Sequence, residues 1–527
     1  MGGTATGILA RTARGAGWVL AWRLVTRMLG LASSLVLVRL LAPGDFGLVA
    51  LAATLATAID ICLALGVEDQ IVRARHPGRA LYDTAFTLNL LRAAVVAILV
   101  AAAAAPAARF FSDARLEAVL IALAISAAVS GIENIGTVDF RRDLDFDKEF
   151  RLLLLPRLAG MAVTLLAAIT LHSHWALVAG ILTGRTANLA MGYAMHPYRP
   201  RLTFAAWRDL ARVSFWTWAV GITSVARDRM DSLVIGRALG AAQVGIYAAG
   251  AEVATLPTSE MVDPICRAAM PGFAETVRTG TAGTAGETFL RILGLTALLT
   301  LPAGLGISLV AGPVVALAFG QAWVEAAPVV AVLGLASTLT LFGNVGGALL
   351  NAQARLRTLL GITLAGAGCR IVLLLGLTPQ LGLFGAGLAV GLAILTEQLL
   401  LMFAALAALR LRPGALLAGI WRPALAAAAM ALALWLAGLG WASVPTAAAD
   451  AAQRLAAGIA LGVTTYAGTL AVLWIACGRP AAAAEADMLV LLRRIADAIG
   501  GRHRNPAARH VPGARKLRPD WFARRGG

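Results

Sequence analysis

Long apolar segments, separated by short connectors rich in Gly, Pro or charge, run through almost the whole chain. A transmembrane helix needs about 20 consecutive, mostly apolar residues, and on this criterion the pattern predicts fourteen spans. The fold that this predicts is an all-α polytopic membrane protein. The spans are expected at residues 17–41, 45–66, 84–105, 115–136, 152–171, 175–194, 213–238, 243–263, 288–311, 326–350, 358–377, 381–407, 416–438 and 454–476.

Basic residues alternate between successive connectors. Connectors after even-numbered helices carry Arg and Lys, as at Arg141, Arg142 and Lys148, whereas connectors after odd-numbered helices hold almost none. Cytoplasmic loops of membrane proteins collect Lys and Arg, so the alternation predicts that both termini are cytoplasmic. The first apolar segment, 17–41, is too long and too charged for a cleavable signal peptide, and we interpret it as the first transmembrane helix.

One sequence pattern occurs twice. Residues 35–48 align with residues 233–246, and Arg39 and Gly47 of the first copy match Arg237 and Gly245 of the second. The offset corresponds to six predicted helices, so both copies have the same orientation in the membrane. This indicates two six-helix bundles related by an axis along the membrane normal, which is a transporter architecture. The expected organisation is a cytoplasmic N-terminus (1–16), two bundles (17–200 and 201–409), two additional helices (410–477) and a cytoplasmic amphipathic helix with a basic tail (478–527).

Composition supports the membrane assignment and narrows the possible ligands. Apolar residues make up 59% and charged residues 14% of the 527 positions, and the mean hydropathy is +0.79, whereas soluble domains are about 45–50% apolar and about 25% charged. The net charge of +17 resides mainly in loops and tail, so we expect no nucleic-acid partner. The four cysteines are isolated, and His172 and His174 have no third ligand nearby in sequence. We therefore expect no metal site, and the sequence shows no cofactor motif.

The tail from 478 onward is strongly basic. Residues 484–499 place apolar side chains on one face of a helix, which suits a helix lying on the inner leaflet. The remainder would be attracted to anionic membrane lipids. A solvated tail without a role is an equally good interpretation.

Ionisable residues also occur inside the predicted spans, where each costs at least about 2.5–3.5 kcal/mol on insertion scales. Within the predicted spans arginines outnumber carboxylates, which predicts a hydrated, positively charged cavity for an anion. Arg suits phosphate because its planar group binds two oxygens at once. The acids are candidates for ion coupling, since burial raises a carboxyl pKa. The candidate ligands of an anion are Arg23, Arg27, Arg92, Arg185, Arg227, Arg229 and Arg370, and the candidate coupling residues are Asp60, Asp228, Asp231, Glu252 and Glu397.

A structural interpretation of these charges is the alternative. Arg227 and Asp231 lie one helical turn apart, so they could pair and serve only to join helices. Arg157 and Arg291 are predicted near the cytoplasmic ends of their helices, where an arginine can extend its charged group to the membrane surface.

Several segments together resemble a known family. They are Asp231-Ser-Leu-Val-Ile-Gly-Arg237 with Val244-Gly-Ile-Tyr247, Arg39-Leu-Leu-Ala-Pro-Gly-Asp45-Phe-Gly47, and Gly320-Gln-Ala-Trp323. This set resembles the oligosaccharide flippases of polysaccharide biosynthesis, in the multidrug/oligosaccharidyl-lipid/polysaccharide exporter superfamily.

The resemblance implies two lobes around a cationic cavity that opens alternately to each side of the bacterial inner membrane. The implied cargo is an undecaprenyl-diphosphate-linked oligosaccharide for O-antigen, capsule or exopolysaccharide, and the implied partners are membrane lipids, a polymerase and a chain-length regulator. The diphosphate ligands implied are Arg23, Arg27, Arg227 and Arg229, and a proton or sodium ion would be coupled through Asp60, Asp228, Asp231 or Glu252.

Other functions fit less well. A lipid II flippase is the nearest alternative. An antiporter for cationic drugs should have an acidic or apolar cavity. A membrane glycosyl polymerase or ligase would usually need a substantial outer loop, and no outer connector approaches 30 residues. A purely structural scaffold would not need a surplus of buried arginine, so we expect a transporter and not an enzyme.

Overall fold

The structure is a computed structural model of the chain. It describes residues 35–63, 66–74, 77–143, 145–210, 215–259, 282–442 and 444–480, with a few further positions between 26 and 33 and between 484 and 489. All regular elements in these ranges are helices. Most of the first predicted span, including Arg23 and Arg27, lies outside the described residues, as does the tail from 490 onward.

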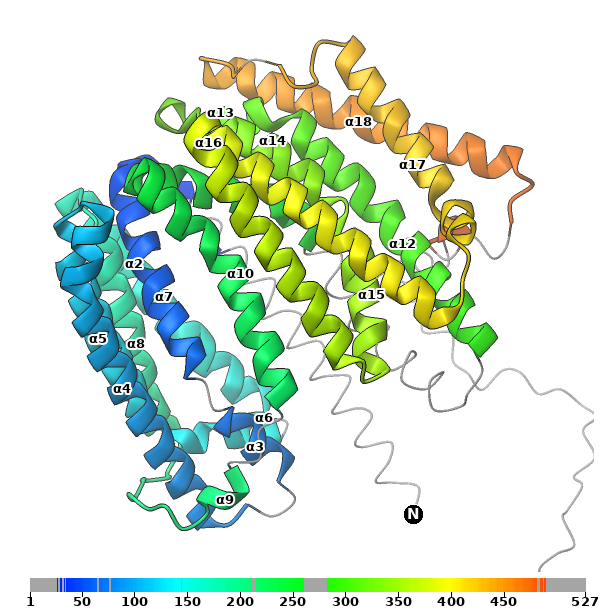
Figure 1. The fold of residues 1–527 in the computed structure, drawn as a ribbon. Coiled ribbons are helices and arrows are strands. Elements are labelled where there is room, and N and C mark those ends of the chain that lie inside the picture. Colours follow the sequence, from blue (N-terminus) through cyan, green and yellow to red (C-terminus); the bar gives the residue numbers. More distant parts are fainter. Residues whose placement is uncertain are drawn as a thin grey trace, which may run out of the picture.

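The described helices form two groups that lie side by side (Figure 1). We call the first group the N-lobe. After the helical residues 35–40 it contains α2 (Pro43–Cys62), α3 (Val67–Arg73), α4 (Arg79–Phe111), α5 (Arg115–Gly131), η1 (Ile135–Thr137), α6 (Val138–Arg142), α7 (Phe146–Leu171) and α8 (Trp175–Met195). Within it, α4 packs on α5, and α7 packs on α8.

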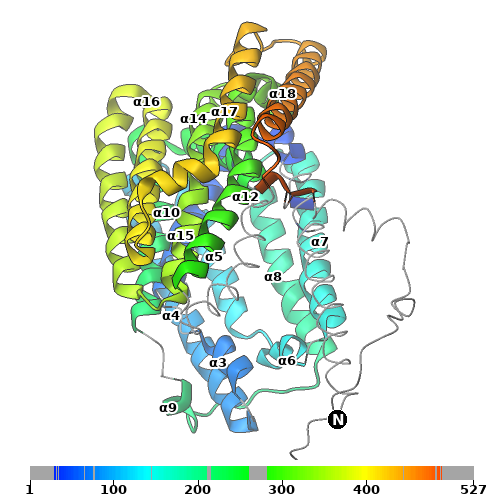
Figure 2. The same ribbon diagram turned by 90° about the vertical axis from the view of Figure 1, so that its right-hand side faces the viewer.

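The second group, the C-lobe, follows the short helix α9 (Trp207–Leu210). It contains α10 (Phe215–Leu239), helical residues 241–259, α12 (Ala282–Leu309), α13 (Ala311–Ala318), η2 (Gln321–Trp323), α14 (Ala326–Ser337), α15 (Thr340–Ala352) and α16 (Leu356–Leu409). Two more helices, α17 (Pro413–Leu436) and α18 (Ala448–Ala476), pack on α12 and α13, as Figure 2 shows at the upper end of the molecule.

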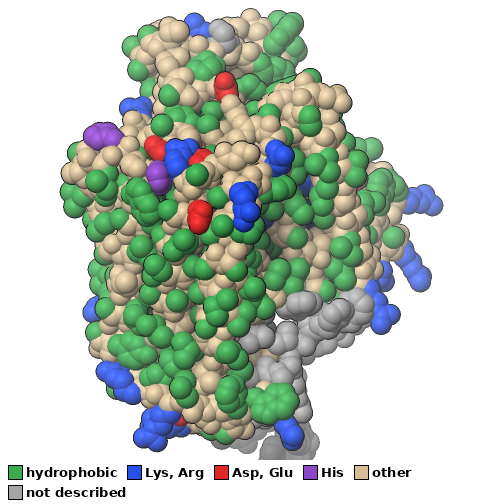
Figure 3. All heavy atoms as spheres, turned by 60° about the vertical axis from the view of Figure 1, so that its left-hand side comes forward, with side chains coloured by type: hydrophobic (Ala, Val, Ile, Leu, Met, Phe, Trp, Pro, Cys, Tyr) green, Lys and Arg blue, Asp and Glu red, His purple; other side chains and the backbone are tan. Residues whose placement is uncertain are grey.

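The helices are suited to a lipid bilayer. Among the described residues, seven helices are long and apolar enough to cross a membrane, or nine if two bent helix pairs each count as one span. On the face drawn in Figure 3, hydrophobic side chains cover much of the surface, and charged side chains form a group in the upper third and others along the lower and right-hand edges. The protein is thus a helical multi-pass membrane protein, while the predicted total of fourteen spans is not settled by this count.

The longest helix shows why spans and helices do not correspond one to one. With 54 residues, α16 would be about 80 Å long if straight, far more than the roughly 30 Å of a bilayer core. Its chain breaks at Gly382, which has φ 61° and ψ −139°. This break falls at the boundary between the predicted spans 358–377 and 381–407.

At the upper end of Figure 1, the two copies of the repeated sequence meet. A Cβ atom added to Gly47 would lie 1.8 Å from the carbonyl oxygen of Ala241 and 2.6 Å from the amide nitrogen of Gly245. Reciprocally, a Cβ added to Gly245 would lie 2.4 Å from the carbonyl oxygen of Pro43. Each glycine thus packs against the turn between the two helices of the other copy, as an approximate two-fold axis between the halves would require. We call this backbone contact the glycine seam.

Side chains reinforce the contact between the lobes at the same end. Arg39 donates hydrogen bonds to the carbonyl oxygens of Leu317 and Ala318, which belong to α13. The buried indole of Trp323 donates to the carbonyl oxygen of Val38 at 2.9 Å and meets the ring of Phe46 edge-on. The upper ends of the two lobes are therefore joined in this conformation.

At the lower end, the linker between the lobes is bonded to α4. The amide of Arg201 donates to Asp83, that of Thr203 to Thr87 and that of Ala206 to Thr84, all within 3.0–3.1 Å. Burial and the hydrogen bond to Asp83 raise the pKa of Tyr198 in this linker. The linker up to α9, which also packs on α4, therefore belongs structurally to the N-lobe.

Candidate functional site

Most of the predicted site residues that the structure describes fall into three places, and the first is an ion pair inside the N-lobe. Arg92 of α4 bonds to Asp60 of α2 and donates two further hydrogen bonds, of 3.1 and 3.3 Å, to the side-chain oxygen of Asn89. The Arg92 side chain is 18% exposed, whereas that of Asp60 is 46% exposed. The guanidinium charge of Arg92 is thus already neutralised.

The second place is a buried cluster in the C-lobe. Arg370 of α16 bonds to both carboxylate oxygens of Asp231, with a distance of 2.6 Å from its Nε, and the hydroxyl of Tyr247 donates to the same carboxylate at 2.8 Å. The side chains of Arg370 and Asp231 are 11% and 6% exposed. Arg227 pairs with Asp228 at 2.8 Å and with Glu397 of α16, not with Asp231 as its sequence spacing suggested.

This C-lobe cluster cannot supply the predicted surplus of positive charge. Two guanidinium groups, Arg227 and Arg370, face three carboxylates, Asp228, Asp231 and Glu397. Breaking a buried ion pair by removing one partner costs about 3–5 kcal/mol. The cluster therefore joins α10 to both halves of α16 in this conformation.

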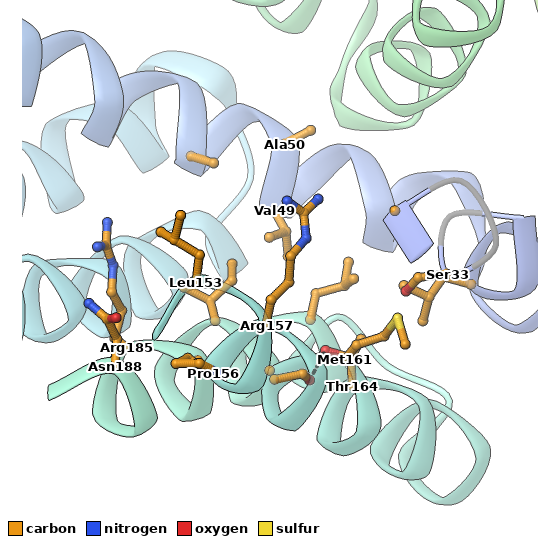
Figure 4. Close-up of a pocket in the computed structure, with 18 of the residues that line it drawn as sticks. Ser33, Val49, Ala50, Leu153, Pro156, Arg157, Met161, Thr164, Arg185 and Asn188 are labelled. Atoms are coloured by element: carbon orange, nitrogen blue, oxygen red, sulfur yellow. Dashed lines mark hydrogen bonds between the residues drawn. The ribbon is translucent and has the colours of Figure 1, made fainter. Parts of the chain in front are cut away.

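The third place is a pocket in the N-lobe of about 800 Å³. Gly30, Ser33 and Leu37 line it together with residues of α2, α7 and α8, and most of the lining residues are apolar or glycine. Figure 4 shows Arg157 extending from α7 toward Val49 and Ala50 of α2, with Arg185 and Asn188 of α8 at one side. We call this space the N-lobe pocket.

Its two arginines are poorly neutralised. Arg157 forms no ion pair with any residue that the structure describes, and a Cβ at Gly30 would lie 3.2 Å from one of its terminal nitrogens. It therefore reaches across the pocket toward Gly30. Arg185 is half exposed, and its one carboxylate neighbour in the described part of the chain is Glu133 at 3.6 Å. An apolar pocket with two such guanidinium groups is suited to an anionic group with several oxygens.

Two other predicted residues stay apart from these places. Arg229 is exposed, and Glu252 is partly buried; the side chains of both lack ion-pair partners among the described positions. Arg157 and Glu133 were not predicted as site residues. Their spacing along the chain gave no signal, because only the packing of α5, α7 and α8 brings them to neighbouring pockets.

Comparison with known proteins agrees with this architecture. A family model described as polysaccharide biosynthesis protein matches residues 36–328. The lipopolysaccharide biosynthesis protein WzxC of Escherichia coli (strain K12) is 26% identical over 353 residues, which cover 66% of this chain and 70% of that protein. The succinoglycan biosynthesis transport protein ExoT of Rhizobium meliloti (strain 1021) is 24% identical over 330 residues, which cover 61% of this chain and 65% of ExoT, just under two thirds of its length.

Solved structures show the same fold. The lipid II flippase MurJ, in an inward closed conformation, has a TM-score of 0.70 at 11% identity and covers 87% of this chain and 99% of its own. An inward-facing multidrug resistance MATE family transporter of the MOP superfamily has a TM-score of 0.54 at 14% identity, over 72% of this chain and 94% of its own. The family model alone spans more than half of the sequence. The chain therefore belongs to the polysaccharide biosynthesis protein family.

Proposed function

We propose that this protein is a flippase that moves undecaprenyl-diphosphate-linked oligosaccharide repeat units across the bacterial plasma membrane, for synthesis of a surface polysaccharide such as O-antigen, capsule or exopolysaccharide. Its family membership supports this proposal, as do the names of relatives concerned with lipopolysaccharide and succinoglycan biosynthesis. The observation that carries it is the N-lobe pocket, which two guanidinium groups line, those of Arg157 and Arg185, with Glu133 beside Arg185 at 3.6 Å.

The pocket suits the diphosphate of such a cargo. Arg157 and Arg185 project from neighbouring helices, so their planar groups can each bind phosphate oxygens through paired N–H donors. Hydrogen bonds to charged groups contribute about 1.5–3 kcal/mol each. Sugars would follow the headgroup between the lobes while the lipid tail stays in the bilayer. Arg23, Arg27 and Arg229 remain proposed further ligands along this route.

The proposed transport cycle is alternating access. The glycine seam, Arg39 and Trp323 join the upper ends of the lobes. The charge alternation of the connectors supports an orientation with that end outside and both termini in the cytoplasm. In this conformation cargo would enter from the cytoplasmic side. Rocking of the lobes would then separate the upper ends. We propose Asp60, Asp228, Asp231, Glu252 and Glu397 as coupling candidates, and a polymerase and chain-length regulator as pathway partners.

A lipid II flippase is the second candidate. The TM-score of 0.70 to MurJ favours it, but at 11% identity that likeness concerns the fold. Its cargo also carries a diphosphate, so the pocket alone does not separate the two. A cationic-drug antiporter is disfavoured because the N-lobe pocket is positively charged. Nothing in the described site supplies a nucleophile paired with a base, so we propose a transporter and not an enzyme.

Arginine replacement in the pocket tests the proposal. In a bacterium that lacks its own copy of the gene, Arg157→Ala and Arg185→Ala should abolish surface polysaccharide while the protein remains inserted at normal levels. Arg151→Ala is the matched control, because Arg151 lies on the same helix but pairs with Asp147 outside the pocket. Wild-type polymer levels in both pocket variants would refute the role of the pocket. Rescue of cells depleted of their lipid II flippase would favour the second candidate.

A further inference from the structure

A second, smaller pocket adjoins the N-lobe pocket. It has a volume of about 190 Å³ and shares Leu152, Leu153 and Asn188 with the larger pocket. Its lining is polar and includes Glu133, in the connector between α5 and η1, which faces Arg185. The two pockets therefore meet at the Arg185–Glu133 pair.

That ion pair is unusually loose. The closest distance is 3.6 Å, from a terminal nitrogen of Arg185 to Oε1 of Glu133, whereas a guanidinium and a carboxylate that share hydrogen bonds lie about 2.7–2.9 Å apart. Oε1 of Glu133 is buried and has no hydrogen-bond partner in the described structure. The Glu133 side chain is 26% exposed and that of Arg185 is 50% exposed. Arg185 is thus held by a carboxylate that could be exchanged for another anion.

The other charged groups around Glu133 leave Arg185 as its nearest counter-ion. Arg141 of α6 lines the smaller pocket, but it donates to Glu149 of α7 at 3.1 Å. Glu68 of α3 lines the same pocket and adds a like charge. Asn89, Asn134, Thr137 and Asn188, the remaining polar lining side chains, are neutral.

We propose that Glu133 is a resident counter-ion which the cargo's phosphate displaces from Arg185, and that the released carboxylate takes up one proton from solvent. This inference rests on the proposed function, because it concerns the same pocket. Phosphate and carboxylate compete for the same planar group of donors. A mostly buried carboxylate that loses its cation, and that faces Glu68, favours its protonated form.

The exchange gives the pocket a way to release its cargo. When Glu133 loses the proton, its carboxylate competes again for Arg185 and weakens phosphate binding. Binding of phosphate and binding of the proton are therefore mutually favourable, and by linkage each strengthens the other by the same factor. The pocket would therefore hold its cargo more tightly on the more acidic side of the membrane and release it more readily on the more alkaline side, so this exchange sets the pH dependence of cargo affinity and does not itself drive export.

Binding of inorganic pyrophosphate to the full-length protein in detergent tests the inference. Isothermal calorimetry in buffers of different ionisation enthalpy counts the protons taken up, and titrations between about pH 5.5 and 8 give the affinity. Where the coupled carboxylate is ionised in the free protein, the affinity of the wild type should fall by up to tenfold per pH unit. Pyrophosphate itself titrates in this range but contributes equally to every variant, so variants are compared with wild type.

Glu133→Gln should bind pyrophosphate at least as tightly as wild type and take up about one proton fewer. Asp147→Asn is the matched control, because Asp147 pairs with Arg151 on the same helix and lines neither pocket, and it should keep the wild-type proton uptake. Glu133→Asp keeps the charge but shortens the side chain and so weakens its hold on Arg185. It should bind pyrophosphate more tightly than wild type and take up less than the wild-type number of protons, and it replaces Glu133→Gln if that variant does not fold.

The outcomes separate this inference from the proposed function. Wild-type proton uptake in Glu133→Gln, with pyrophosphate binding that still depends on Arg157 and Arg185, would overturn the inference and leave the flippase proposal intact. Pyrophosphate binding that is absent from the wild type, or is unaffected by both arginine replacements, would instead refute the pocket as the headgroup site.

Discussion

A methyl group at Gly47 should separate the upper ends of the two lobes. Replacement by Ala places a carbon 1.8 Å from the carbonyl oxygen of Ala241, whereas carbon and oxygen approach to about 3.3 Å at closest in ordinary contacts. The obstructing atoms belong to the backbone of the other lobe, so no side-chain rotation relieves the overlap. The lobes must move apart by about 1.5 Å for normal contact distances.

The size of the expected transport defect follows from the energy of this overlap in the closed conformation. Overpacking typically costs about 1–3 kcal/mol, and this cost applies only while the glycine seam is closed. The same substitution favours helix α2 by about 0.5–1 kcal/mol in any conformation, which does not alter the balance between open and closed states. A bias of 1–3 kcal/mol corresponds to a change of about 5–150-fold in the ratio of closed to open molecules. Gly47→Ala should therefore impair transport by depleting the closed state.

Gly44→Ala is the matched control for surface polysaccharide production. Gly44 lies in the first turn of the same helix, but its added Cβ would meet the Cβ of Ala242 at an unstrained 4.0 Å, so the variant should transport normally. Gly245→Ala should reproduce the defect, because its Cβ would lie 2.4 Å from the carbonyl oxygen of Pro43.

Cross-linking measures the closed state directly. The 4.0 Å separation matches the Cβ–Cβ distance in disulfides, so a Gly44→Cys/Ala242→Cys pair, in a background without the native cysteines, should form a disulfide. Gly47→Ala should slow its formation. Undiminished cross-linking together with normal polymer production would refute the reasoning.

Four further outcomes are expected. Arg370→Ala leaves Asp231 buried without its cation and should cost about 3–5 kcal/mol, seen as a lower melting temperature that Arg370→Ala/Asp231→Ala partly restores. Arg229→Ala should abolish surface polysaccharide without loss of inserted protein, if Arg229 binds the diphosphate; unchanged polymer would exclude that role. Deletion of the chain after Gly501 should affect polymer production only mildly, and complete loss would show that the tail is needed. Burial lowers the pKa of His196, so the unfolded chain binds its proton first as the pH falls below about 6.5 and stability decreases; hydrogen exchange of residues 198–206 should rise on acidification in wild type and less in His196→Asn.

Much of the fold could be predicted because the bilayer imposes a simple rule on the sequence. Spans such as 175–194 and 416–438 nearly coincide with α8 and α17, since apolar residues must continue for the thickness of the hydrocarbon core. The short helix α13 was not predicted because it continues the apolar segment of α12 without a polar break. The repeat was predicted from Arg39 and Gly47, residue types that chance rarely repeats in a chain rich in Ala and Leu.

The site was harder to predict, because its chemistry depends on which helices face each other. Arg227 and Glu397 are 170 positions apart, and sequence spacing suggested Asp231 as the partner instead. Counting charges within spans gave a surplus of arginine but not its location. The structure pairs Arg92, Arg227 and Arg370 closely with carboxylates and leaves Arg157 and Arg185 in the N-lobe pocket. Whether a charge is neutralised is a property of tertiary packing, which periodicity along one helix does not contain.

The linker bonded to α4 limits where the molecule can bend. Three amides of the linker are hydrogen-bonded to Asp83, Thr84 and Thr87. The eleven or so residues after α8 therefore cannot extend or bend freely when the two lobes move relative to each other. A swivel between the halves would have to originate beyond Leu210. Peptide tags inserted before that point would report on one rigid body, whereas insertions after it would alter the joint itself.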